Sequence, residues 1–144
     1  MYQHILITLN YSSSDARVIA KGVQLQQRYQ AKLSLVHALD NIAMPDTAYG
    51  TRITLDQATD YPELEREKQR LLLTADNLQL QHQDCWLVWG SPQQEILRVA
   101  QRLQVDLIIV GAHTQHGLAI LAGSTANSVL HHAPCDLLAV HLPS

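Results

Sequence analysis

Short apolar segments alternate with longer amphipathic segments along the chain. The apolar segments, which are rich in Leu, Ile and Val, are His4 to Leu9, Lys32 to Leu39, Asp84 to Trp89, Asp106 to Val110 and Asp136 to Leu142. Runs with almost no polar residue are typical of strands that have helices on both faces. Because such strands alternate with helices, the pattern predicts an α/β fold with five parallel strands.

The amphipathic segments predict four helices. The first follows Ser12 to Asp15, whose side-chain oxygens suit a helix start, and it runs to about Gln30. Its predicted apolar face consists of Ala16, Ile19, Ala20 and Val23. The last is expected from Ser124 to His132, and Pro134 stops it.

The second helix is expected to begin near Pro62, a residue that suits the first turn. Its apolar residues recur on one side, at Leu64, Leu71, Leu72, Ala75 and Leu78. The other side is charged and is expected to be solvated; it comprises Glu63, Glu65, Arg66, Glu67, Lys68 and Arg70. The third helix has a clear start, because Ser91 precedes Pro92 and Gln94 completes a capping box. Its predicted buried stripe is Ile96, Ala100 and Leu103.

Two connections carry no clear pattern, residues 41–60 and 114–122. Long connections in compact α/β proteins are often functional. In an open parallel sheet, ligands bind beyond the carboxyl ends of the strands. The positions expected at that edge are Asn10 and residues 39–40, 90–91 and 111–114.

Composition narrows the classes of protein that suit this fold. The chain has 144 residues, 47% of them apolar, and a formal net charge of −3, which suits one domain over residues 1–144. Its ten Lys and Arg form no basic run, so nucleic acid is not an expected partner. No apolar stretch approaches the ~20 residues of a membrane span, and no signal peptide is visible, so we expect a cytoplasmic protein without a membrane partner. Cys85 and Cys135 lack metal-binding spacing and are expected to be buried thiols.

Candidate chemistry concentrates in residues 111–124. Gly111, Gly117 and Gly123 follow the fourth predicted strand, where glycines let backbone N–H groups approach a phosphate. The same glycines also suit simple turns, and the pattern leaves both interpretations open. The segment is neither a P-loop nor a dinucleotide-binding motif.

Metal and catalytic interpretations have less support. His113 and His116 are three residues apart, and His131 and His132 are adjacent, but no Cys, Asp or Glu completes a ligand set, so no metal site is predicted. Ser124 with His113 or His116 would supply a nucleophile and a base, but no carboxylate stands at a recognisable position to orient the histidine. No catalytic residue is therefore predicted.

Several segments, in this order and spacing, resemble the universal stress protein family over nearly the whole chain. They are residues 4–12, 33–38, 90–96, 106–111 with Gly123-Ser124, and 132–140. The resemblance implies an open five-stranded parallel sheet in the order 3-2-1-4-5 with helices on both faces, an adenine nucleotide alpha hydrolase-like fold. It also implies a homodimer that pairs through the last strand, residues 136–142.

The family includes members that bind ATP and members that do not. The resemblance implies that ATP-binding members carry Gly-x-x-Gly, nine residues, then Gly-Ser or Gly-Thr, and an Asp after the first strand. Gly111, Gly123 and Ser124 match, but Thr114 stands at the second glycine, the spacer has eight residues, and Asn10 stands where the Asp would be. The residues predicted to contact a nucleotide, where one binds, are Asn10, Ala38, Gly111, Thr114, Gly123 and Ser124.

A β-branched Thr at a position that calls for glycine disfavours close approach of a phosphate. We therefore predict a non-enzymatic stress-response protein that acts as a homodimer through partner proteins, with a degraded or weak nucleotide site and no cofactor. The alternatives are a switch protein that binds ATP or another adenine nucleotide, and a slow ATP hydrolase.

Overall fold

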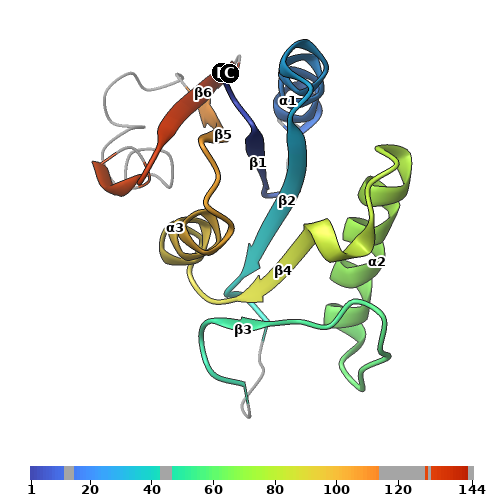
Figure 1. Ribbon diagram of the computed structural model, residues 1–144. Coiled ribbons are helices and arrows are strands. Elements are labelled where there is room, and N and C mark those ends of the chain that lie inside the picture. Colours follow the sequence, from blue (N-terminus) through green and yellow to red (C-terminus); the bar gives the residue numbers. More distant parts are fainter. Residues whose placement is uncertain (12–14, 43–46, 114–128, 130, 143–144) are drawn as a thin grey trace.

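The computed structural model describes residues 1–11, 15–42, 47–113, 129 and 131–142, in which six strands form one sheet in the order β3-β4-β2-β1-β5-β6 (Figure 1). The strands are β1 (His4–Leu9), β2 (Lys32–Leu39), β3 (Thr51–Arg52), β4 (Cys85–Trp89), β5 (Leu107–His113) and β6 (Asp136–Leu142). The helices are α1 (Asp15–Tyr29), α2 (Pro62–Asn77) and α3 (Pro92–Leu103), and a 3-10 turn covers His82–Asp84.

Five of these strands confirm the predicted sheet. β4, β2, β1, β5 and β6 are parallel and stand in the order that the resemblance implied. β1, β2 and β6 have the predicted bounds, β4 begins one residue later than expected, and β5 begins one residue later and continues three residues further, to His113. Asp106 lies outside β5 because its carboxylate accepts the backbone N–H groups of Gln3 and His4, at 2.9 and 3.0 Å.

The prediction of a wholly parallel, five-stranded sheet is wrong at one edge. β3 lies within the connection 41–60 and pairs antiparallel with β4. Gly50 adopts a φ of +94° before β3, and its N–H donates to the Trp89 carbonyl at 2.6 Å. Two residues without an apolar pattern give no sequence signal for a strand, so contacts with β4 decide this one.

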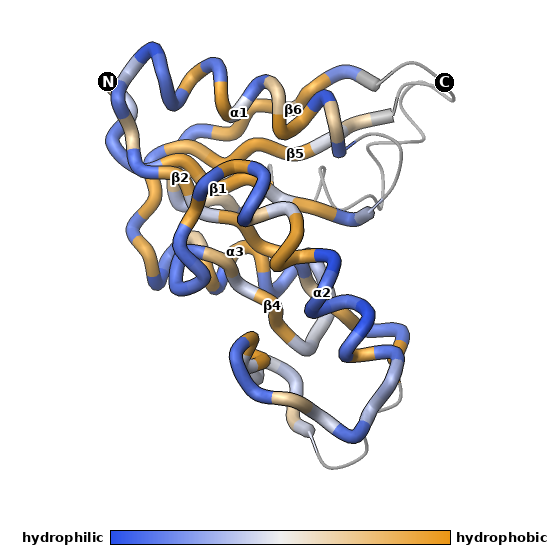
Figure 2. The backbone as a smooth tube through the Cα atoms, turned by 90° about the vertical axis from the view of Figure 1, so that its right-hand side faces the viewer, coloured by the Kyte–Doolittle hydropathy of each residue, from blue (hydrophilic) through white to orange (hydrophobic). Residues whose placement is uncertain are grey.

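The sheet separates two hydrophobic cores. On one face, α1 and α2 pack against Ile5, Ile7 and Leu9 of β1; on the other, α3 packs against Leu6 (Figure 1). Successive strand residues point to opposite faces, which explains the division. Figure 2 shows the hydrophobic stretches of the chain gathered in the strands, whereas α2 alternates between hydrophobic and hydrophilic residues. The predicted helices on both faces are confirmed, and no helix in the described part of the chain is long and apolar enough to cross a membrane.

α1 turns part of its predicted face to the sheet, because Ile19 and Val23 are partly buried and pack against the core as expected. Val18 and Gly22 are its buried residues, whereas Ala16 and Ala20 are exposed. Gly22 packs so closely on β1 that a Cβ there would lie 2.4 Å from Cδ1 of Ile7. Apolar periodicity alone favoured the alanines because it gives a glycine no weight.

α2 confirms its predicted stripe at Leu64 and Leu71, but its charged side is not fully solvated. Lys68 is only 1% exposed. Its ammonium group donates to the Gln57 carbonyl and to Oε1 of Glu65. The cation is therefore buried together with its partners, as buried charges require.

Three smaller expectations need comment. Ser91 does precede α3, but no side-chain hydrogen bond caps the helix, so the predicted capping box is wrong. Cys85 is buried as expected, whereas Cys135, in the turn before β6, is partly exposed. Of the predicted helix from Ser124 to His132, residues 129, 131 and 132 are described and helical, and the remainder lies outside the described residues.

Candidate ligand-binding site

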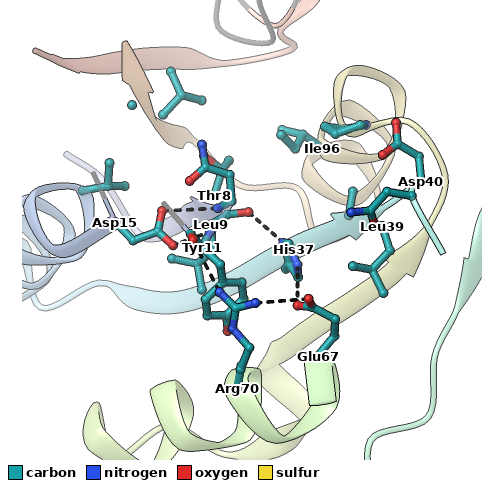
Figure 3. A pocket seen from close by; sticks show the side chains of 17 residues that line it. Thr8, Leu9, Tyr11, Asp15, His37, Leu39, Asp40, Glu67, Arg70 and Ile96 are labelled. Carbon is teal, nitrogen blue, oxygen red and sulfur yellow. Dashed lines mark hydrogen bonds and ion pairs between the residues drawn. The ribbon is translucent and has the colours of Figure 1, made fainter. Parts of the chain in front are cut away.

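A cavity of about 350 Å³ lies at the carboxyl ends of β1, β2 and β5 (Figure 3). It is lined by Asn10, which follows β1, and by Ala38 and Gly111, which lie near the carboxyl ends of β2 and β5. Pro92 and Ile96 of α3 close one side. The position agrees with the rule that ligands of open parallel sheets bind beyond the strand ends.

The turn between β1 and α1 forms a second side. Asp15 is the first residue of α1, and its carboxylate accepts the backbone N–H of Tyr11 at 2.7 Å and that of Asn10 at 3.2 Å. Tyr11 adopts a φ of 56°, which these bonds hold in place. Burial raises the pKa of Asp15, and the two N–H groups act against that rise. Asp15 thus closes the preceding turn in addition to starting the helix.

A chain of polar contacts forms the side toward α2 (Figure 3). His37 is 7% exposed; its Nδ1 lies 3.0 Å from the Leu9 carbonyl and its Nε2 lies 3.2 Å from Oε2 of Glu67. A carbonyl only accepts, so Nδ1 is the donor in the contact with Leu9. Glu67 also accepts from Nη1 of Arg70 at 3.1 Å.

Arg70 covers Tyr11 at the end of this chain. The guanidinium carbon lies 4.1 Å from the centre of the tyrosine ring, and Nη2 donates to the Tyr11 carbonyl at 3.4 Å. The ring of His37 meets the same tyrosine edge-to-face at 4.7 Å. Burial raises the pKa of Tyr11 to about 12, so its hydroxyl stays neutral near pH 7.

The charges of the described lining are mainly negative. Asp15, Asp40 and Glu67 contribute carboxylates, and Arg70 contributes the one guanidinium. Arg70 is already engaged by Glu67 and Tyr11. Such a lining favours groups that donate hydrogen bonds and repels anions. Within the described residues, no three His, Cys, Asp or Glu side chains are arranged to hold a metal ion.

Comparison with known proteins identifies the family of this chain. Residues 1–141 match the universal stress protein family. The chain belongs to this family. Universal stress protein A homolog 2 of Coxiella burnetii is 36% identical over 142 residues, which are 98% of this chain and 96% of the relative. Universal stress protein A homolog 1 of the same organism is 30% identical over 141 residues, 96% of each chain.

Solved structures of universal stress proteins share the fold. One in complex with cAMP has a TM-score of 0.69 at 20% identity and covers 97% of both chains. The universal stress protein UspA from Lactobacillus plantarum has a TM-score of 0.61 at 25% identity and covers 96% of this chain and 97% of that one.

In this universal stress protein, three of the six residues predicted to contact a nucleotide line one cavity, namely Asn10, Ala38 and Gly111. The other three, Thr114, Gly123 and Ser124, lie outside the described residues, as do Gly117 and His116. The backbone of His113 belongs to the end of β5.

Sequence reasoning missed the side chains that give the cavity its charge. Asp15 was assigned to helix capping alone, and Glu67 and Arg70 were placed on a solvated surface. A signal did exist, because Glu67 follows Leu64 by three residues and Arg70 precedes Leu71 by one, so both flank the buried stripe of α2.

Proposed function

We propose that this universal stress protein is a non-enzymatic stress-response protein that acts as a homodimer and has a nucleotide site too weak for tight ATP binding. The negative charge of the cavity lining supports the last part of this proposal, the weak nucleotide site. The described lining carries three carboxylates, from Asp15, Asp40 and Glu67, and the one guanidinium of Arg70, which Glu67 already engages. A triphosphate brings several more negative charges, and like charges repel strongly in a partly buried site.

An uncharged nucleoside suits the same lining better. The carboxylates of Asp15 and Asp40 accept hydrogen bonds from ribose hydroxyl groups or from an amino group on a base. Val18, Leu39 and Ile96 supply apolar contacts for the ring system.

The second candidate is a switch protein that binds an adenine nucleotide. It is favoured by the convergence of Asn10, Ala38 and Gly111 on one cavity. A universal stress protein with the same fold was solved in complex with cAMP. Because cAMP has one phosphodiester, this lining repels it less than it repels ATP.

Calorimetric titration separates the two candidates. We expect ATP with Mg²⁺ to bind more weakly than micromolar, and adenosine to bind more tightly than ATP. Glu67→Gln removes one charge from the lining and should tighten ATP binding several-fold. Glu63→Gln removes the same charge from an exposed position of α2 outside the lining, so it should leave ATP binding unchanged.

Sub-micromolar binding of ATP to the unaltered protein would overturn the weak-site proposal and support the switch. Adenine nucleotide that copurifies with the protein, visible as a shifted absorbance ratio, would have the same meaning. Equal ATP affinities for Glu67→Gln and the unaltered protein would refute the charge argument.

The non-enzymatic part rests on the hydroxyl groups of the described lining. Thr8 Oγ1 donates to the Ile109 carbonyl at 3.0 Å, and the Tyr11 hydroxyl lies 3.4 Å from Thr74 Oγ1. Both are engaged in structural contacts, and neither is paired with a base as a nucleophile needs. ATP turnover above a buffer control, proportional to protein concentration, would contradict this part.

The homodimer part rests on β6. Within the described part of the chain this strand is an edge of the sheet, and its consecutive residues Leu137, Leu138 and Ala139 are uncharged. Such an edge tends to pair with another strand. Light scattering at micromolar concentration should give twice 16.1 kDa, and Ala139→Lys should reduce it to 16.1 kDa. A 16.1 kDa species for the unaltered protein would refute the dimer.

A further inference from the structure

Two arginines stack on Trp86, at a place remote from the cavity. The guanidinium carbon of Arg52 lies 3.5 Å from the centre of the Trp86 ring, and the guanidinium carbon of Arg102 lies 5.6 Å from the same centre. Trp86 is the second residue of β4, near the amino ends of the parallel strands. The cavity lies beyond the opposite ends, so the two places are separate.

Three elements bring these side chains together. Arg52 of β3 lies opposite Val88 in the antiparallel pair, so its side chain is on the face of the sheet that also carries Trp86. Arg102 belongs to the last turn of α3, which packs on this face through Val99. The arrangement follows from the unpredicted edge strand, because β3 is the element that supplies Arg52.

No carboxylate neutralises either guanidinium within the described part of the chain. Arg52 uses Nη2 to donate to the carbonyls of Gln83 and Cys85, at 3.0 and 3.1 Å. Asp84 acts on Arg52 electrostatically, but its carboxylate pairs with Lys32 at 3.4 Å. The one other arginine of α3, Arg98, pairs with Glu95.

Donors therefore outnumber acceptors around this ring. Arg52 and Arg102 are both exposed. Trp86 is 7% exposed, and its Nε1 has no hydrogen-bond partner among the residues that the structure describes. Packing over Trp86 partly removes the Arg52 guanidinium from water, which lowers its pKa, and the nearby charge of Arg102 lowers it further. The two like charges destabilise each other until an anion joins them.

We propose that Arg52 and Arg102 form a binding site for a phosphate dianion, from inorganic phosphate or from a small phosphomonoester. A dianion neutralises both guanidiniums, whereas a carboxylate leaves one charge uncompensated. Guanidinium groups bind phosphate through paired, charge-assisted hydrogen bonds, and the contact with Trp86 together with the two carbonyl bonds holds Arg52 in place in advance. The site is independent of the nucleotide cavity and of the function proposed for it.

The indole N–H resonance of Trp86 in ¹⁵N-labelled protein gives a local readout. Inorganic phosphate is titrated against sodium chloride at equal ionic strength, and a simple sugar phosphate forms a second arm. We expect a saturable shift of the Trp86 signal with phosphate and none with chloride. Trp89, whose ring contacts Tyr49, serves as the internal reference. A local signal is needed because phosphate also stabilises proteins without binding to them.

Variants then assign the site. Arg102→Gln should weaken phosphate binding about tenfold or more, and Arg102→Lys, which keeps the charge but loses the planar group, should weaken it less. Arg28→Gln is the matched control, because Arg28 lies 5.9 Å from the Tyr29 ring on another element. A stronger response to the sugar phosphate than to phosphate identifies a phosphomonoester as the ligand, and the reverse identifies free phosphate.

The proposal is overturned by an unsaturable Trp86 shift, by an equal shift with chloride, or by equal weakening in Arg28→Gln and Arg102→Gln. Arg102→Gln keeps β3 intact, so the result does not depend on the folding of the edge strand.

Discussion

Substitution of Gly22 by alanine tests how closely α1 packs on the sheet. An alanine in the middle of a helix is favoured over glycine by about 1 kcal/mol. The added Cβ, however, would lie 2.4 Å from Cδ1 and 2.7 Å from Cγ1 of Ile7, and 3.6 Å from Cδ1 of Ile109. Ile7 is fully buried, so its side chain can move only by displacing neighbours in a close-packed interior. Overpacking of this kind costs about 1–3 kcal/mol, so we expect Gly22→Ala to lower the free energy of unfolding by about 1 kcal/mol net.

Urea denaturation of a small set of variants separates the two contributions. Ala20→Gly, at an exposed position of the same helix, measures the helix propensity alone and should cost about 1 kcal/mol. Ile7→Val removes Cδ1, the nearest atom, and leaves Cγ1, so Gly22→Ala should cost less in that background by about 0.5 kcal/mol or more. Two results would refute the reasoning. One is that Gly22→Ala stabilises the protein by the amount that Ala20→Gly destabilises it. The other is that the effects of Gly22→Ala and Ile7→Val on the free energy of unfolding are additive.

Three further predictions concern buried and titrating groups. Glu95 is 1% exposed, and Nη1 of Arg98 lies 3.3 Å from its Oε1. Arg98→Ala leaves that buried carboxylate without its partner, so it should destabilise the protein by about 1–2 kcal/mol in urea denaturation. Adding Glu95→Gln removes the unpaired charge and should recover part of the loss. Burial lowers the pKa of His4 below its ordinary 6.5, and the charge of Lys32 lowers it further. The unfolded chain therefore binds more protons around and below pH 6.5, so the protein should lose stability as pH is lowered there, and His4→Gln should flatten that slope in urea denaturation. Hydrogen bonds to Asp56 and Asp76 raise the pKa of His82 above 6.5. The stability that protonated His82 contributes is therefore present below pH 6.5 and is lost as pH rises through the raised value. The stability difference between the unaltered protein and His82→Gln should shrink over that rise, and a difference that stays constant would refute this prediction.

The strands were predictable because burial on both faces leaves a strong sequence signal. Each of the five parallel strands is a short apolar run, and three have the predicted bounds. β3 has no such signal. Its pairing depends on the turn at Gly50 and on the stacking of Arg52 over Trp86, which bring together residues far apart in the sequence. Interactions of this kind are not visible in a local pattern.

The position of the cavity was predictable, whereas its charge was not. Asn10, residues 39–40 and Gly111 follow from the rule for strand ends, since the parallel order alone places them at one edge. Lys68 shows what a closer look at helical spacing would have found: it lies four residues after Leu64 and three before Leu71, so it falls within the buried stripe. The charge of Lys68 predicts an exposed side chain, whereas its spacing predicts a buried one, and the side chain is buried.

The buried Lys68 links the unpatterned connection 41–60 to the cavity. Its ammonium group holds the Gln57 carbonyl, and Glu65 accepts the N–H of Thr59 at 2.7 Å, so this part of the connection is fixed to the first turns of α2. Glu67 and Arg70 lie on the same helix and supply the charged side of the cavity. Because charges within a few ångströms of a ligand dominate its electrostatic energy, we expect substitutions in α2 to change the ligand preference proposed for this cavity without altering the strand ends. The glycine pattern after β5 is therefore an incomplete criterion for nucleotide binding in a chain whose α2 carries this acidic group.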